Sequence, residues 1–423
     1  MTKLGVLFSV LGVGAGCIPA FAQKQLPNII VMLSDDQGWG DLGFTGNTFV
    51  QTPNIDRIAH EGTILENFYV CPVSSPTRAE FLTGRYHVRS CVNSTTGGGE
   101  RFNLGEKTIA EYFREAGYAT SLFGKWHSGT QYPYHPNARG FEEFYGFCSG
   151  HWGNYWNPVL EHNGEIISGE GFIIDDLTDK ALDYIRDHKE HPFFMFLSYN
   201  TPHSPMQVPD SWWNRVKDRT LSQRATFPEQ EDTTFTKAAL ALAENLDWNI
   251  GRVLSLLHSL DLEQETIVIY FSDNGPNSFR WNGGMKGRKG STDEGGVRSP
   301  FCIRWPGHIR KGAVETQLSG AIDLIPTLLG LAGIEYTPLR KLDGIDWGQR
   351  LLDEKAPAID RVLYSYWGGK TSVRISYYLL DAEDHLYKTD IDRAQRKDVS
   401  DKEPEIYERS YWRISRRRIP VRL

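Results

Sequence analysis

The stretch of the chain best suited to chemistry is residues 74–85, Ser-Ser-Pro-Thr-Arg-Ala-Glu-Phe-Leu-Thr-Gly-Arg. It places a small nucleophile, Ser74, just before a predicted helix and a fixed cation, Arg78, one helical turn further along. Ser75 can cap this helix and Gly84 can end it. The free N–H groups of a helix N-terminus also attract anions. The stretch therefore combines a nucleophile with features that hold an anion.

Acidic and amide side chains follow two predicted strands near the points where the strands end. Asp35 and Asp36 follow the first strand, and Asp273 and Asn274 follow a later one. The carboxyl ends of strands line the ligand-binding crevice of open α/β sheets. Three carboxylates and an amide form an all-oxygen donor set, which suits a hard cation such as Ca²⁺ or Mg²⁺. The alternative is a pair of ordinary turns, because Asp and Asn favour turns.

Basic and titratable candidates also follow predicted strands or lie in loops: Lys125, His127, His203 and Lys289. A net charge of −7 excludes the global basic field that nucleic-acid binding requires, so local cations must hold an anionic substrate. Histidine exchanges protons near neutral pH, and the two histidines therefore suit acid and base roles. Each of these side chains could instead be structural or simply solvated.

A sheet must position these residues, and the apolar pattern predicts one. Short apolar runs, typical of buried strands, lie at residues 29–33, 119–123, 193–198, 266–271 and 301–304. Helical patterns alternate with them, at residues 109–115, 175–188, 237–259 and 322–331. This alternation predicts an α/β fold in which helices flank a large mixed, mostly parallel sheet. Residues 205–235 lack clear periodicity, and we expect a surface excursion there.

The pattern of predicted elements changes after Gly344. Runs at 362–367, 373–380 and 386–389 predict antiparallel strands, followed by a charged tail. The arginines of this tail indicate a solvated terminus rather than a nucleic-acid patch. The 423 residues are enough for two domains. We therefore predict a catalytic domain over residues 23–344 and a small C-terminal subdomain with an antiparallel sheet over 345–423.

The first 22 residues predict a secretory signal peptide. An apolar run follows Lys3 and ends in a small-x-small cleavage site at residues 20–22. The alternative is lipid attachment at Cys17. We expect an exported protein, periplasmic or secreted, without an integral membrane span, because no other segment is long and apolar enough.

Four cysteines remain after this leader: Cys71, Cys91, Cys148 and Cys302. In an exported chain they could pair. They are sparse for the length of the chain, so disulfides cannot be the basis of the fold. The chain has no Cys-x-x-Cys spacing, which argues against a thiolate zinc site.

The spacing of residues 74–85 resembles the signature of the type I sulfatases of the alkaline phosphatase superfamily, (Cys or Ser)-x-Pro-(Ser or Thr)-Arg-x-x-x-Leu-Thr-Gly-Arg. In that family the first residue is oxidised after translation to formylglycine. The spacing of the motif excludes Cys71 as its first residue. The proline, the arginine and the Thr-Gly-Arg triplet have the required sequence spacing only when they are counted from Ser74. The resemblance implies a serine-type bacterial member, in which a radical-SAM maturation enzyme converts Ser74.

Further motifs extend the resemblance over most of residues 27–390. Asp-Asp-x-Gly at 35–38 and Asp-Asn-Gly at 273–275 match the metal motifs of the family. The resemblance implies one Ca²⁺ ion, with Mg²⁺ as the less favoured alternative. The implied ligands are Asp35, Asp36, Asp273, Asn274 and the modified Ser74.

Gly-Lys-Trp-His, Pro-His-Ser-Pro and Gly-Arg-Lys-Gly motifs carry the basic candidates and match the family as well. Arg78 is implied to bind the hydrated formylglycine, and Lys125 to bind sulfate. His127 would take a proton from the diol, and His203 would protonate the leaving oxygen or bind sulfate. Lys289 would bind sulfate and the leaving group. A hydrated aldehyde offers two hydroxyls, one to attack sulfur and one whose deprotonation expels sulfate.

The residues around the pocket favour a sulfated carbohydrate outside the cytoplasm, because aromatic rings stack on sugars and polar side chains bond hydroxyls and carboxylates. The candidate rim residues are His151, Trp152, Asn154 and Arg280. The aromatic cluster around them could equally be core packing.

Two other functions remain open. The first is a phosphomonoesterase or phosphodiesterase of the same superfamily that uses Ser74 unmodified. Such enzymes commonly bind two metals through several histidines, and no such set is evident here. The second is a non-catalytic binder of sulfated glycans that has kept the pocket.

Overall fold

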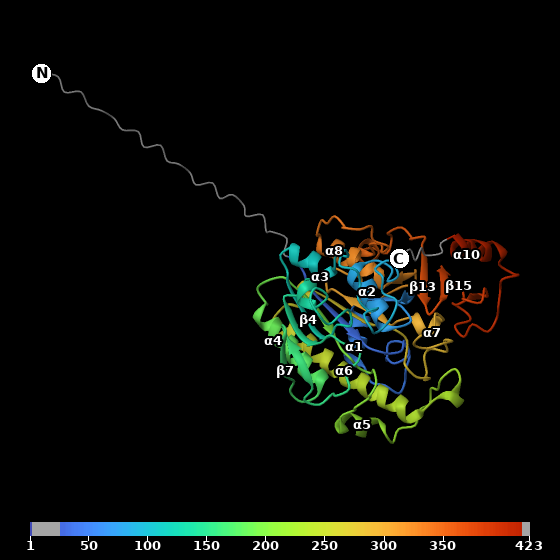
Figure 1. The fold of residues 1–423 in the computed structure, drawn as a ribbon, viewed down its shortest axis with the longest axis horizontal. Helices are drawn as coiled ribbons and strands as arrows, with labels where there is room; N and C mark the ends of the chain where they lie inside the picture. The colour runs from blue at the N-terminus through green and yellow to red at the C-terminus, as the bar shows by residue number, and fades with distance from the viewer. Residues whose placement is uncertain (2–25, 417–423) are drawn as a thin grey trace.

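The computed structural model describes Met1 and residues 26–416, with side chains up to residue 412 (Figure 1). The predicted signal peptide and Cys17 lie outside the described residues, and the side chains of the arginine-rich end are not described. Within the described part, no helix has both the length and the apolar character needed to cross a bilayer.

A ten-stranded sheet forms the centre of the molecule. From edge to edge its strands are β11 (Ala313–Glu315), β2 (Thr63–Leu65), β10 (Phe301–Arg304), β9 (Thr266–Ser272), β1 (Asn28–Ser34), β8 (Phe193–Ser198), β4 (Ala119–Lys125), β5 (Glu143–Phe147), β6 (Val159–His162) and β7 (Glu165–Ser168). Strands β9, β1, β8, β4 and β5 run parallel, whereas β10, β6 and β7 are antiparallel to their neighbours. The predicted large, mixed and mostly parallel sheet is confirmed.

Helices cover both faces of this sheet, because its central strands are apolar on both sides. Ile29, Val31 and Leu33 of β1 pack in one core, together with residues of α2 (Ser74–Thr83), α3 (Ile109–Glu115) and α8 (Leu324–Ala332). Ile30 and Met32 of β1 pack in the other, together with residues of α1 (Pro53–Glu61), α4 (Ile173–Asp187) and α6 (Thr233–Ser259).

The region predicted as a surface excursion contains α5 (Asp210–Val216) and the short 3₁₀ helix η2 (Pro228–Gln230). Helix α5 lies against α6, and Val216 is fully buried there. The remaining short elements are β3 (Phe68–Tyr69), β12 (Ser319–Gly320), η1 (Pro136–Arg139), η3 (Glu263–Glu265), η4 (Ala321–Asp323), α7 (Glu294–Val297) and α9 (Gly348–Leu352).

The C-terminal region forms the predicted small antiparallel sheet. Its strands are β13 (Val362–Trp367), β14 (Lys370–Ile375), β15 (Tyr378–Leu380) and β16 (Leu386–Lys388). The prediction of one strand over 373–380 was wrong, because the chain reverses at Ser376, where φ is 51°. The predicted charged tail includes a helix, α10 (Pro404–Arg416), which lies against β14 and β15. Trp347 and Leu351, which precede β13, pack in the core that contains residues of α2, α3 and α8. They therefore belong to the packing of the large sheet rather than to that of the small one.

All four cysteines in the described part of the chain are free thiols. The disulfide bonds that an exported chain could form are therefore absent from the described part of the structure. Cys71, Cys148 and Cys302 are buried, and Cys91 is exposed. The large core on both faces of the sheet, rather than crosslinks, holds the fold together.

The register of the parallel strands places the site. Ser34 at the end of β1 pairs with Ser272 at the end of β9, and Gly124 in β4 pairs with Ser198 at the end of β8. The carboxyl ends of four adjacent strands thus meet at one edge of the sheet. Residues that follow these strands are brought together there, although they are far apart in sequence.

Candidate active site

Helix α2 carries the predicted nucleophile. The helix begins at Ser74, and its N-cap is Val73, so the prediction that Ser75 caps it was wrong. The Ser75 hydroxyl instead donates to the Ser94 carbonyl at 2.9 Å. At the other end Gly84 adopts the left-handed conformation (φ 66°), which explains why a glycine ends the helix.

The Ser74 hydroxyl oxygen is the centre of a compact group of polar atoms. It lies 2.5 Å from Asp273 Oδ2, 2.9 Å from Arg78 Nε and 3.2 Å from His127 Nδ1. The Arg78 side chain is fully buried and also donates to Asp273 Oδ2 at 3.1 Å. Its remaining N–H groups bond the Lys125 carbonyl and the Ser198 hydroxyl, which fixes the guanidinium beneath the nucleophile.

The surroundings of His127 determine its tautomer. Its Nε2 lies 2.8 Å from the carbonyl oxygen of Thr95, which can only accept a hydrogen bond. Nε2 therefore carries the ring proton, and Nδ1 presents a lone pair to Ser74. Burial and the Lys125 cation hold the pKa of His127 well below its usual range, so the ring is neutral and able to accept a proton.

The four predicted metal ligands lie together at the strand ends. Asp36 N donates to Asp273 Oδ1 at 3.2 Å, and Asn274 Nδ2 donates to Asp36 Oδ1 at 2.8 Å. Three buried oxygens of this group lack any hydrogen-bond partner: Asp35 Oδ1, Asp36 Oδ2 and Asn274 Oδ1. Buried acceptors without partners are costly in a folded protein. Their oxygen chemistry and their convergence fit a hard divalent cation.

Lysines balance these carboxylates. Lys125 Nζ lies 2.6 Å from Asp35 Oδ2, with both side chains buried, and Lys289 Nζ lies 2.6 Å from Asp36 Oδ1. Burial alone would raise the pKa of Asp35, but the cations around it, Lys125 first, hold that pKa below its usual range. Burial likewise acts to lower the pKa of Lys289, yet the Asp36 and Asp35 carboxylates raise it. The site is thus an array of fixed opposite charges.

Two site residues have strained backbones. Asp36 and His127 have φ angles of 64° and 60°, a region that side chains other than glycine rarely occupy. Such conformations cost on the order of 1–3 kcal/mol each and concentrate at functional sites. Here His127 faces Ser74 through Nδ1, and the Asp36 carboxylate faces Asn274 and Lys289.

His203 approaches the metal ligands from the loop after β8. Its Nδ1 lies 2.7 Å from the Ser204 carbonyl, and its Nε2 lies 3.6 Å from Asp36 Oδ2. The His203 side chain is partly exposed, unlike the carboxylates beside it. It therefore lies between the buried ligands and solvent, where a leaving group would depart.

An open pocket of about 460 Å³ leads to this group. Ser74, Lys125, His127, His203 and Lys289 all line it. The other lining residues are Val73, Thr95, Thr96, Ser149, Gly150, His151 and Trp367. Trp367 was missed as a site residue: its strand was predicted over 362–367, but no motif marks the residue, and only the folded chain brings the end of β13 to the pocket.

Comparison with known proteins identifies the family. A model of the Sulfatase family matches residues 27–334. The chain belongs to the sulfatase family. It is 32% identical to human N-acetylgalactosamine-6-sulfatase over 84% of this chain and 70% of the relative, and 30% identical to the uncharacterised sulfatase YdeN of Escherichia coli over 82% and 70%. The crystal structure of Ps i-CgsB in complex with k-i-k-neocarrahexaose has a TM-score of 0.82 at 29% identity and covers 93% of this chain and 92% of that one.

The protein is accordingly a sulfuric ester hydrolase. In this sulfatase, buried ion pairs lie in the segment that follows Lys289. Glu294 forms ion pairs with Arg298 and Arg374, and Arg374 also donates to the Thr292 carbonyl at 3.0 Å. Since Arg374 lies in β14, the C-terminal sheet contacts the segment that follows Lys289.

The predicted rim residues of the sulfatase fall into two groups. His151 and Asn154 are exposed, and the His151 ring lies 5.4 Å from that of His203. Trp152 instead stacks on Phe147 at 5.0 Å and packs against the core. Arg280 is only 3% exposed, and its guanidinium binds Asp41. Arg280 therefore lies in the interior rather than on the rim, where it orders the loop that begins at Asp36 by donating to the Asp36 carbonyl.

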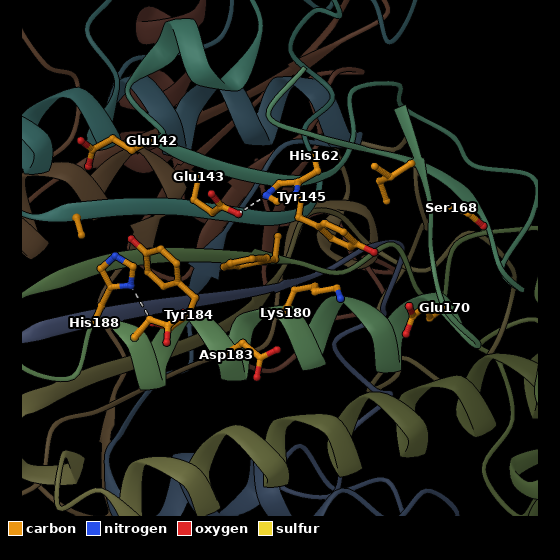
Figure 2. A pocket seen from close by; sticks show the side chains of 14 residues that line it. Glu142, Glu143, Tyr145, His162, Ser168, Glu170, Lys180, Asp183, Tyr184 and His188 are labelled. Atoms are coloured by element: carbon orange, nitrogen blue, oxygen red, sulfur yellow. Dashed lines mark hydrogen bonds and ion pairs between the residues drawn. The ribbon is translucent and has the colours of Figure 1, made fainter. Parts of the chain in front are cut away.

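A larger pocket of the sulfatase, of about 740 Å³, lies elsewhere (Figure 2). In this pocket residues of α4, such as Lys180 and Asp183, face residues at the start of β5. Five carboxylates line it against a single lysine: Glu142, Glu143, Glu170, Asp183 and Asp187. It contains none of the predicted site residues, and its negative charge opposes a sulfated ligand.

Proposed function

We propose that this sulfatase removes an O-sulfate from a carbohydrate, using formylglycine made from Ser74 and one Ca²⁺ ion. The carbohydrate assignment is supported by relatives named N-acetylgalactosamine-6-sulfatase and by a similar structure that holds a neocarrahexaose. The open pocket supports it too, because Trp367 offers a ring for a sugar face and His151 offers a polar group.

The observation that carries the formylglycine proposal is the surroundings of Ser74. Its single hydroxyl faces two acceptors, Asp273 Oδ2 and the lone pair on His127 Nδ1. One hydroxyl proton can satisfy only one of them. A hydrated aldehyde at this position has two hydroxyls, one for each acceptor. Hydrated formylglycine supplies one hydroxyl to attack sulfur and a second whose loss of a proton releases sulfate.

The metal proposal is supported by the three unpartnered oxygens on Asp35, Asp36 and Asn274. Together with Asp273 and residue 74 they would hold one cation. The all-oxygen set favours Ca²⁺, since Mg²⁺ demands stricter octahedral geometry and keeps several waters. Such an ion would polarise a sulfate oxygen and favour an ionised hydroxyl at residue 74.

The side chains of the pocket then have distinct tasks. Arg78 holds the oxygen at position 74, and Lys125 and Lys289 offset negative charge that grows on the sulfuryl oxygens. His127 Nδ1 accepts a proton from residue 74.

His203, nearer the solvent, gives a proton to the leaving alcohol. The overall reaction is R–O–SO₃⁻ + H₂O → R–OH + SO₄²⁻ + H⁺. Water supplies the oxygen that the departing sulfate requires, and no oxidant or reductant is consumed.

The maturation and export of the enzyme are part of the proposal. A serine at position 74 calls for a serine-type, radical-SAM maturation enzyme as partner, because the Cys-specific route requires a thiol. The apolar leader at residues 1–22 directs the chain out of the cytoplasm, where sulfated glycans lie. Residues 23–344 would then form the catalytic domain and 345–423 the subdomain that contributes Trp367.

Peptide mass spectrometry of the enzyme from its native host tests the central claim. We expect the peptide that contains residue 74 to have lost two hydrogens, with Cys71 unchanged. The same preparation should release inorganic sulfate from members of a panel of sulfated mono- and oligosaccharides. Unmodified Ser74 in a preparation that prefers phosphate monoesters would replace this proposal with the phosphatase alternative.

A further inference from the structure

Outside the active site, three side chains that can bind metals meet beyond the end of β5. His135 is the N-cap residue of η1, Cys148 directly follows β5, and Glu161 lies in β6. One ligand atom from each lies within 4.8 Å of the others. Three segments that are separate in the sequence thus converge on one point.

The individual contacts are close. His135 Nε2 lies 2.5 Å from Glu161 Oε1, and Cys148 Sγ lies 3.9 Å from Glu161 Oε2. The side chains of His135 and Glu161 retain 12% and 18% of their exposure, whereas Cys148 is buried. An ion can therefore reach the group from solvent and still be enclosed on the side of the core.

We infer that His135, Cys148 and Glu161 form a second metal site, which binds Zn²⁺. An imidazole, a thiolate and a carboxylate are the three ligand types of zinc, and a fourth position is left for water. Ca²⁺ and Mg²⁺ prefer oxygen ligands alone, so the resident ion of the active site is a poor competitor here. This inference does not depend on the proposed substrate or on formylglycine.

The geometry requires small movements. Tetrahedral zinc bonds of usual length hold two ligand atoms about 3.4–3.6 Å apart. His135 and Glu161 must separate, and Cys148 must approach Glu161 by a few tenths of an ångström. If zinc binds Nε2 of His135, the ring proton of this histidine must be on Nδ1. The Nδ1 atom can then no longer accept the 3.3 Å hydrogen bond from Asn137 N, and this bond is lost. The thiol proton of Cys148 passes to solvent, because zinc binds the thiolate.

A second His–Cys–Glu group in the described part of the chain shows what distinguishes the proposed site. Cys71, Glu80 and His87 also have ligand atoms within 4.8 Å of one another, but all three are buried. Both ring nitrogens of His87 face carbonyl oxygens, at 2.7 Å from Val92 and 3.1 Å from Tyr366. No nitrogen of His87 is left for a metal, whereas His135 Nε2 meets only the Glu161 carboxylate.

The proposed site adjoins the active-site pocket. The Cys148 carbonyl accepts a hydrogen bond from His127 N at 3.2 Å, and Ser149 and Gly150 come next in the chain and line the pocket. A zinc ion would tie this segment to β6 and to the N-terminus of η1. Its expected role is to steady the rim, not to take part in sulfate release.

Cobalt absorption provides a direct test, because Co²⁺ substitutes for Zn²⁺ and a cobalt–thiolate bond absorbs strongly in the near ultraviolet. The full chain would first be saturated with Ca²⁺ and then titrated with Co²⁺. We expect one equivalent of Co²⁺ to produce the thiolate band and Zn²⁺ to abolish it. Cys91→Ser is the matched control, because Cys91 is an exposed thiol that does not belong to the group, and it should keep the band.

Two variants make the test decisive. Cys148→Ser should lose the band and the tight equivalent of zinc measured by elemental analysis. His135→Gln keeps the thiol and should weaken zinc binding at least tenfold, so it reports on the site even if Cys148→Ser folds poorly. A wild-type protein with no thiolate band, or a band that survives in Cys148→Ser, would overturn the inference. Neither readout requires sulfatase activity, so this result is separate from the fate of the proposed function.

Discussion

The two candidate metal sites differ in how the chain builds them. In the active site, four oxygen ligands follow the ends of two adjacent parallel strands, and the Ser34–Ser272 register brings them together. In the second group, His135, Cys148 and Glu161 come from a 3₁₀ cap, a strand end and the antiparallel strand β6. The first arrangement follows from the topology of the sheet, whereas the second depends on loop conformations.

The surrounding charge differs as well. Cations surround the carboxylates of the active site, with Lys125, Arg78 and Lys289 all in ion pairs there. No lysine or arginine is paired with Glu161 in the described part of the chain. We therefore expect an anionic substrate to bind at the first site and not at the second. The second group, with its sulfur and nitrogen ligands, is suited to an ion with a structural role.

The largest expected effect concerns the nucleophile of the first site. Ser74→Ala removes the side-chain oxygen from which formylglycine would be made and should lower sulfate release by about 10⁴-fold or more, because the reaction loses its nucleophile. Release of inorganic sulfate from a small aryl sulfate measures this. The melting temperature should stay within a few degrees, and wild-type turnover by the variant would overturn the mechanism.

Loss of a metal ligand should have the next largest effect. Asp35→Asn keeps the shape of the side chain but removes one charge, and we expect sulfate release to fall about 10²–10³-fold. The stabilisation of the protein by added Ca²⁺, seen as a shift in melting temperature, should shrink at the same time. As a control, Asp183→Asn in the acidic pocket of Figure 2 should change neither quantity.

A moderate effect is expected at the rim. Trp367→Ala should raise KM for a sulfated oligosaccharide up to about tenfold, because a stacked ring contributes roughly 0.5–1.5 kcal/mol. The kcat for a small aryl sulfate should change less than twofold, since Trp367 contacts none of the reacting groups. Trp412→Ala is the control, an exposed tryptophan on α10 that does not line the pocket. Equal losses on both substrates would instead indicate a folding defect.

The smallest effect on catalysis should come from the second metal group. Cys148→Ser should leave sulfate release within about twofold when Ca²⁺ is saturating, because Cys148 touches no reacting group. The rise in melting temperature that Zn²⁺ gives the wild type should disappear in this variant. Thermal denaturation with and without zinc measures this, and an equal zinc effect in both proteins would contradict the comparison.

Sequence reasoning succeeded where strands and motifs carried the information. The five predicted strands of the main sheet match β1, β4, β8, β9 and β10 nearly to the residue, because each is a short apolar run before a polar end. Strands β6 and β7 were missed, since each has only four residues, of which two are apolar, and most of these residues are not buried. The side chains expected around Ser74 do meet in space, but their distances came only from the structure.

Other features were beyond the sequence for physical reasons. Arg280 and Trp152 are polar or aromatic residues in a plausible rim segment, yet burial against Asp41 and Phe147 decides their positions. Trp367 reaches the pocket through the packing of a separate sheet. The group at Cys148 has no fixed ligand spacing, so only the folded chain brings its three members together.

The buried pair between Arg374 and Glu294 has a practical meaning for protein engineering. A chimaera that exchanged the C-terminal sheet to alter substrate choice would also remove a partner of Glu294, which lies five residues after Lys289. We expect such a hybrid to need an arginine opposite Glu294 in the incoming segment, so the choice of a donor sheet is restricted by this one buried pair.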